Sequence, residues 1–124
     1  MVGIYCFGSF NKKDSLAWEL ADELFIKGVY FKKCSRVEDL LGAKGDIYIL
    51  DVVKGLKQVT IIDDVEKLET GDLVSLHDFD VGFFIKFLKG LRAVNAKVIG
   101  IPYGSKKQKV IKEVETVISD LVKK

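Results

Sequence analysis

Three side chains in this sequence, Asp14, Asp51 and His77, have the chemistry of a partial coordination shell for a divalent metal ion. A carboxylate pair with one imidazole suits a divalent transition metal, and water can complete the shell. The three residues are far apart in the sequence, so they form a site only if the fold brings them to one edge. His77 is the single histidine of the chain, which makes it the one imidazole ligand available.

Each of these residues also has a purely structural interpretation. Asp51 lies inside a run of Ile, Leu and Val, where burying a carboxylate without a partner is costly, and this favours a functional role. Asp14 is followed by Ser15 and an apolar helical pattern, so it could be a helix N-cap. His77 could be an exposed loop residue, or it could form with Asp78 a cap before the next helix.

The pattern of apolar residues predicts the elements that must position these side chains. Short apolar runs predict strands, and apolar residues at helical spacing predict helices. The strands are expected at 2–7, 29–33, 46–53, 58–62 and 97–102, and the helices at 15–27, 81–94 and 105–123, with a shorter one at 37–41. The first helix is expected to turn Leu16, Leu20, Ala21, Leu24 and Phe25 inward.

Strands that alternate with helices predict an α/β fold, here a single-domain three-layer sandwich over residues 1–124 with a mostly parallel, twisted sheet. Only a short turn joins strand 46–53 to strand 58–62, and a parallel crossover needs a dozen or more residues. Strand 58–62 is therefore expected to be the one antiparallel strand. In such sheets ligands bind outside the carboxyl ends of the strands, where we expect Asp14, Asp51 and His77 to converge.

Composition excludes several other classes of protein. The net charge of +2 is too weak to indicate nucleic-acid binding, and the basic cluster at 106–109 is interpreted as the solvated start of a helix. No apolar run approaches the roughly 20 residues of a membrane span, and no signal peptide is recognised. Cys6 and Cys34 are too few for a disulfide scaffold, so we expect buried thiols and a cytoplasmic location.

Four motifs, in order along nearly the whole chain, resemble those of the hydrogenase maturation proteases, which trim the large subunit of nickel-iron hydrogenases. In that family a Gly-Asn-x-Leu-x-x-Asp-Asp/Glu-Gly-x-Gly segment follows the first strand, an Asp ends the central strand, a Ser-x-His element comes next, and an Ile-Gly-Ile-x-Pro-like strand is late. The corresponding segments here are Gly8-Ser-Phe-Asn-Lys-Lys-Asp14-Ser15, Ile49-Leu50-Asp51-Val52-Val53, Ser75-Leu76-His77 and Val98-Ile99-Gly100-Ile101-Pro102.

The resemblance implies an aspartic-type endopeptidase that removes the C-terminal tail of a nickel-loaded hydrogenase large-subunit precursor. It implies that Asp51 is catalytic and that Asp51 and His77 bind the nickel, which the substrate supplies and for which other divalent metals can substitute. The family's second acidic position is Ser15 here, and Leu16 stands at a family glycine. Either Asp14 replaces the missing carboxylate as the third metal ligand, or the affinity for the metal is reduced, or the protein is a divergent member without activity.

Two alternatives to this function remain open at the level of the sequence. The first is a non-catalytic member of the same family that binds the precursor as a maturation accessory protein, and Ser15 favours it. The second is a receiver-like or flavodoxin-like domain. A receiver needs an acidic pair after the first strand and a flavodoxin needs a loop of Ser, Thr and Gly there, and residues 7–12 provide neither.

Overall fold

The structure is a computed structural model, and it describes residues 2–11, 14–40, 42–43, 45–63, 73–75 and 95–123. The strands are β1 (Val2–Phe7), β2 (Val29–Cys34), β3 (Asp46–Lys54), β4 (Thr60–Ile62), β5 (Val74–Ser75) and β6 (Asn95–Pro102). The helices are α1 (Leu16–Glu23), the 3-10 helix η2 (Val37–Leu40) and α3 (Lys107–Val122). Within the described ranges, none of these helices has the length and apolar character needed to cross a membrane.

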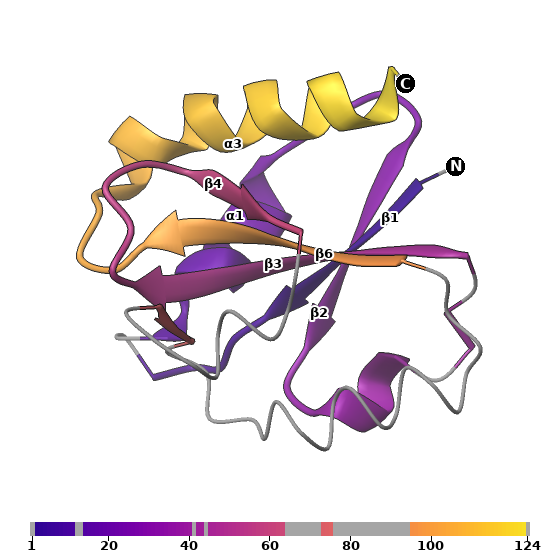
Figure 1. The fold of residues 1–124 in the computed structure, drawn as a ribbon, viewed down its shortest axis with the longest axis horizontal. Helices are drawn as coiled ribbons and strands as arrows, with labels where there is room; N and C mark the ends of the chain where they lie inside the picture. Colours follow the sequence, from indigo (N-terminus) through magenta and orange to yellow (C-terminus); the bar gives the residue numbers. More distant parts are fainter. Residues whose placement is uncertain are drawn as a thin grey trace.

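The strands form one sheet in the order β2-β1-β3-β6-β4, and β5 pairs with β3 outside this path (Figure 1). Strands β2, β1, β3 and β6 run parallel, whereas β4 runs antiparallel to β6. The α/β class, the mostly parallel sheet and the antiparallel strand near 58–62 are therefore confirmed. The partner of β4 is β6, which is inserted between β3 and β4. The sequence pattern did not predict β5, which is antiparallel to β3.

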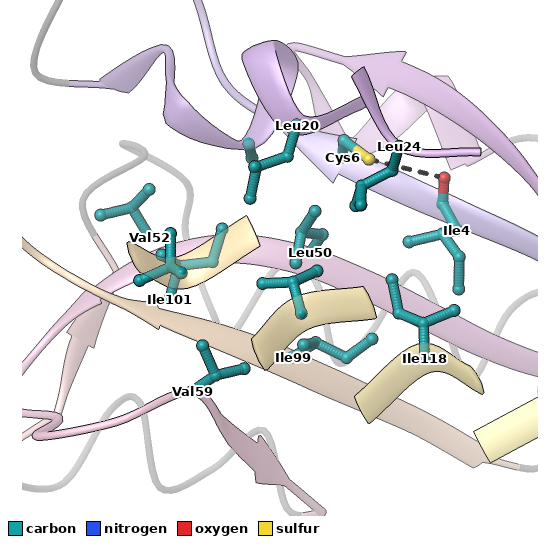
Figure 2. Close-up of a cluster of buried hydrophobic side chains, with 13 residues drawn as sticks. Ile4, Cys6, Leu20, Leu24, Leu50, Val52, Val59, Ile99, Ile101 and Ile118 are labelled. Carbon is teal, nitrogen blue, oxygen red and sulfur yellow. Dashed lines mark hydrogen bonds between the residues drawn. The ribbon is translucent and has the colours of Figure 1, made fainter. Parts of the chain in front are cut away.

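Helices α1 and α3 cover one face of the sheet, and apolar side chains fill the space between the layers (Figure 2). In α3, Val110, Val114 and Ile118 are buried at intervals of four residues, which gives the helix one apolar stripe. The prediction that Phe25 turns inward is wrong, because its side chain is 90% exposed. Helix α1 ends at Glu23, and the extended backbone of the next residue takes Phe25 off the helical face.

The opposite face of the sheet carries a second buried cluster. Its members are Phe7, Cys34, Leu40, Ala43, Ile47, Ile49, Val53, Ile62 and Val98. The central strand β3 contributes to both clusters, so both of its faces are buried, and this explains its nearly continuous apolar sequence. The short helix expected at 37–41 is η2, whereas the helix expected at 81–94 lies outside the described residues.

The side chain of Trp18 in α1 fastens this helix to the sheet. Its indole N–H donates to the carbonyl oxygen of Cys6 and to that of Cys34, both at 3.1 Å. These two carbonyls lie near the carboxyl ends of β1 and β2, so a single donor ties α1 to two neighbouring strands. The ring of Phe10 meets the Trp18 ring edge-on, with 5.1 Å between the ring centroids.

Gly8 lets the connection between β1 and α1 pass close to this tryptophan. A Cβ atom at Gly8 would lie 2.7 Å from the carbonyl oxygen of Asp14 and 2.9 Å from Cδ1 of Trp18. The backbone N–H of Ser9 donates to the Asp14 carbonyl at 3.0 Å, and the N–H of Asp14 donates to the Asn11 carbonyl at 2.8 Å. Gly8 and Trp18 together therefore set the position of Asp14.

Both cysteines are buried free thiols, as the sequence predicts. The Sγ–H of Cys6 donates to the Ile4 carbonyl at 3.7 Å, and that of Cys34 donates to the Lys32 carbonyl at 3.6 Å. Burial raises the pKa of the Cys6 thiol far above its usual range, and it raises the pKa of Cys34 to about 11. Both sulfurs therefore stay protonated at neutral pH.

The Trp18 contact gives a first prediction. Trp18→Phe keeps an aromatic ring but removes the indole N–H and with it the side-chain hydrogen bonds to Cys6 and Cys34, although the Cys34 carbonyl still accepts from the N–H of Gly8. The free energy of unfolding should therefore fall by about 1–3 kcal/mol. Urea unfolding followed by circular dichroism measures this. The control Phe10→Leu changes a 91% exposed neighbour of the same ring and should shift stability by less than about 0.5 kcal/mol. Equal stability of Trp18→Phe and wild type would contradict the role given to the indole N–H.

The buried thiols give a second prediction. The thiolate is the reactive form, so iodoacetamide at pH 8 should modify neither cysteine in the folded protein and both in denaturant. Folding raises the pKa of both thiols, so the folded state is favoured as long as the thiols are protonated. This contribution to stability is complete below about pH 8.5 and is lost as pH rises toward 11. A Cys6→Ala/Cys34→Ala variant should lose less stability between pH 8 and 10.5 than wild type. Rapid native-state alkylation would overturn this account.

Candidate functional site

Asp51 is fully buried in the central strand, with an exposed fraction of 0%. No other charged side chain in the described part of the chain is buried to this degree. Because side chains alternate along a strand, Asp51 points to the same face as Ile49 and Val53, away from α1 and α3. Three further residues of β3 follow it, so the carboxylate lies just inside the carboxyl end of the strand.

Gly100 of β6 pairs with Asp51 and shapes the space beside it. A Cβ atom at Gly100 would lie 2.5 Å from Cδ1 of Leu56 and 3.4 Å from atoms of both Ile62 and Val53. The missing side chain therefore gives Leu56 room to pack on the face that carries Asp51. An ionised carboxylate among such apolar neighbours is costly unless a cation or hydrogen-bond donors stabilise it.

Asp14 follows β1 at the same edge of the sheet. Its Oδ1 atom is buried, as is the Oδ1 atom of Asp51. The N-cap position of α1 belongs to Ser15 and not to Asp14, so the alternative interpretation of Asp14 as the N-cap is wrong. The hydroxyl of Ser15 donates to Oε2 of Glu19 at 3.0 Å, which directs it along the first turn of the helix.

The sheet brings Asp14 and Asp51 to the same region. Strands β1 and β3 are parallel neighbours, and the pairing of Cys6 with Leu50 places the end of β1 level with Asp51. β2, which follows β1 in the sequence, lies on one side of β1, and β3 lies on the other side. The direction in which strands are added to the sheet therefore reverses between β1 and β3. Open α/β sheets bind ligands in the crevice outside the carboxyl ends of the strands at such a reversal.

His77 lies outside the described residues, so the metal site predicted from Asp14, Asp51 and His77 stays a prediction. Within the ranges that the structure describes, no group of three His, Cys, Asp or Glu side chains could hold a metal ion. Ser75, two positions before His77, pairs with Val53 of β3. The segment that leads to His77 therefore reaches the strand end that carries Asp51.

A cleft of about 400 Å³ opens at the same edge on the face covered by α1 and α3. Helix α1 follows β1 and α3 follows β6, and Val52 of the intervening β3 forms part of the floor between them. The other residues that define the cleft include Leu16, Glu19, Tyr103, Ser105 and Lys107.

Lys107 joins the two helices that border this cleft. Its Nζ lies 2.8 Å from Oε2 of Glu23 and 3.7 Å from Oε1 of Glu19. These carboxylates, chiefly that of Glu23, raise the pKa of Lys107. The basic cluster at 106–109 does begin a helix as predicted, but Lys107 also belongs to the wall of a cleft.

Sequence reasoning missed this cleft and the residues Tyr103 and Lys107. One signal was present: Tyr103 and Gly104 follow Pro102 at the end of the last strand, and such turns lie at the edge where α/β sheets bind ligands. No sequence pattern indicates the ion pairs of Lys107, because its partners lie about 85 residues earlier in the chain.

Comparisons with known proteins give one informative result. No protein-family model matches the sequence, and no curated protein matches it. The fold is similar to that of an endopeptidase from Escherichia coli, known from its solution structure, with a TM-score of 0.60. The similarity covers 95% of this chain and 90% of that chain, at 17% sequence identity. At this level of identity the comparison establishes a shared fold.

Proposed function

We propose that this protein is an endopeptidase that removes the C-terminal tail of a nickel-loaded hydrogenase large-subunit precursor. The ordered motifs of the sequence and the fold shared with an endopeptidase support the proposal. The observation that carries it is the convergence of three motif-bearing segments at one edge of the sheet. These segments are the connection after β1, the end of β3 and the strand β5.

The pairing of β5 with β3 is the decisive part of this convergence. Ser75 lies opposite Val53, and Asp51 is two residues before Val53 in the same strand. His77 follows Ser75 by two residues, a length of chain that spans at most about 7 Å. A fold that placed the Ser-x-His segment at the other end of the sheet would exclude joint action of Asp51 and His77.

The donor set suits the metal that the substrate would bring. Carboxylate and imidazole groups are ordinary ligands of divalent transition metals, and Asp14, Asp51 and His77 would bind the nickel of the precursor. Asp51 would hold the precursor from within an apolar surrounding, where charge interactions are stronger than in water. A bound divalent ion can polarise a peptide carbonyl or activate water. The role of the protein is to fix the tail against that centre.

The contact of Ser15 favours a second candidate function. The hydroxyl that replaces the family's second acidic side chain is held by Glu19, so the β1–α1 connection offers Asp14 as its carboxylate at this edge. A site that lacks one acidic ligand could still bind the nickel-loaded precursor. The second candidate is therefore a non-catalytic accessory protein that holds the precursor during maturation.

Incubation with a nickel-loaded large-subunit precursor tests the proposal, with the mass of the precursor as the readout. Wild-type protein should release the tail, and Asp51→Asn should slow its release by about 100-fold or more, as expected for loss of a catalytic acid or base. His77→Ala should have a comparable effect. Asp46→Asn is the matched control, because Asp46 is an exposed aspartate at the other end of the same strand.

Two further outcomes separate the candidates. If the folded wild type leaves the tail intact but co-elutes with the nickel-loaded precursor on gel filtration, the accessory function replaces the protease function. If it neither cleaves nor binds the precursor, both candidates are excluded.

A further inference from the structure

The cleft between α1 and the β6–α3 connection has no part in the chemistry proposed above. Its floor includes Val52, the residue that follows Asp51 in β3. Successive side chains of a strand point to opposite faces, so the cleft and the buried carboxylate lie on opposite faces of one strand end. A peptide that crosses the carboxyl edge of the sheet at β3 would pass from one to the other.

The walls of the cleft combine apolar and charged groups. Partly buried Leu16 supplies apolar surface, Val52 adds only a small patch because it is 2% exposed, and Tyr103 adds an aromatic ring with 45% of the residue exposed. Glu19 and Lys107 supply the charged part of the wall. Ligand sites in proteins have this character, with apolar lining and a few placed polar groups.

The charge near the cleft narrows the kind of peptide that fits. Nζ of Lys54 lies over the Tyr103 ring, 5.1 Å from its centroid, and the exposed Lys106 adjoins Ser105 and Lys107 of the lining. This side of the cleft therefore carries positive charge. In a peptide with an apolar residue next to an acidic one, the apolar side chain would lie on the floor of the cleft and the acidic side chain would lie beside the lysines.

The cleft is also held in shape before any ligand arrives. The backbone N–H of Tyr103 donates to the carbonyl of Val53 at 3.1 Å, which fixes the β6–α3 connection to the end of β3. Lys107 joins the two helices through Glu23 and Glu19. A preformed cleft avoids part of the ordering cost of binding.

We propose that this cleft binds the tail of the substrate beside the scissile bond, as an extended segment with an apolar residue next to an acidic one. This proposal rests on the proposed function, because it takes the peptide from the reaction assigned to Asp51. It adds a substrate-binding role for Tyr103 and for the floor formed by Leu16 and Val52.

Cleavage kinetics with the nickel-loaded precursor test the cleft through two different variants. Tyr103→Ala removes an exposed wall, and Ser105→Arg fills the space. Both should raise KM by about tenfold or more with little change in kcat, because they remove binding contacts away from the reacting groups. Circular dichroism checks that each variant is folded.

The chain offers a matched control for these variants. A second cavity, of about 440 Å³, lies between α3 and the residues before β4 and is lined in part by the exposed Thr116. Thr116→Arg fills that cavity and should leave both KM and kcat at wild-type values. An equal rise in KM for Thr116→Arg and Ser105→Arg would overturn the proposal, because the effect would not be specific to the cleft.

The remaining outcomes distinguish failure of the cleft from failure of the proposed function. If wild type cleaves the precursor and both cleft variants keep its KM, the cleft proposal is wrong and the protease function stands. If wild type does not cleave, a synthetic peptide of the precursor tail is titrated into 15N-labelled protein. Larger amide shifts at Val52, Gly104 and Ser105 than at Gln58 and Thr116 would support the cleft, and their absence would exclude it.

Discussion

The bifurcated hydrogen bond from the indole of Trp18 is the contact on which the candidate site depends. It holds α1 against the ends of β1 and β2, and the chain between β1 and α1 must fit beneath the ring. Only a residue without a side chain fits at Gly8, where the ring and the Asp14 backbone converge. The carboxylate of Asp14 is thereby held at the edge of a rigid sheet although it belongs to a loop. Sites supported in this way keep their geometry better than sites on unsupported loops.

The second constraint is the burial of β3 on both faces. A strand in this position is specified by apolar side chains on either side, and Asp51 replaces one of them with a carboxylate. The carboxylate is fully buried there, and burying a charged group carries a cost in folding free energy that ordinary core residues do not have. Under the proposed function, chemistry and substrate binding would divide between the two faces of one strand, with Asp51 on one and Val52 on the other.

The sequence predicted the elements well where periodicity was strong. The limits of β1 were predicted without error, and β3 and α3 were predicted to within about two residues, because long apolar runs and a regular stripe depend on local pattern alone. Phe25 was misplaced because helical spacing continues in the sequence beyond the end of α1. The buried position of Asp51 could be predicted because it lies within a run of apolar residues. The β6 partner of β4, the strand β5 and the ion pairs of Lys107 could not be predicted, because they depend on contacts between distant segments.

The interior position of β6 has a consequence for folding during synthesis. Synthesis delivers β1, β2, β3 and β4 before β6, yet β6 separates β3 from β4 in the finished sheet (Figure 1). A nascent chain can pair β2, β1 and β3 early, but β4 has no edge to join until the last strand has emerged from the ribosome. Until then the edge of β3 that later pairs with β6 is exposed and can pair with other strands or other chains. Sheets built from segments distant in sequence share this risk of aggregation. Rapid insertion of the final strand would therefore protect the newborn protein from aggregation.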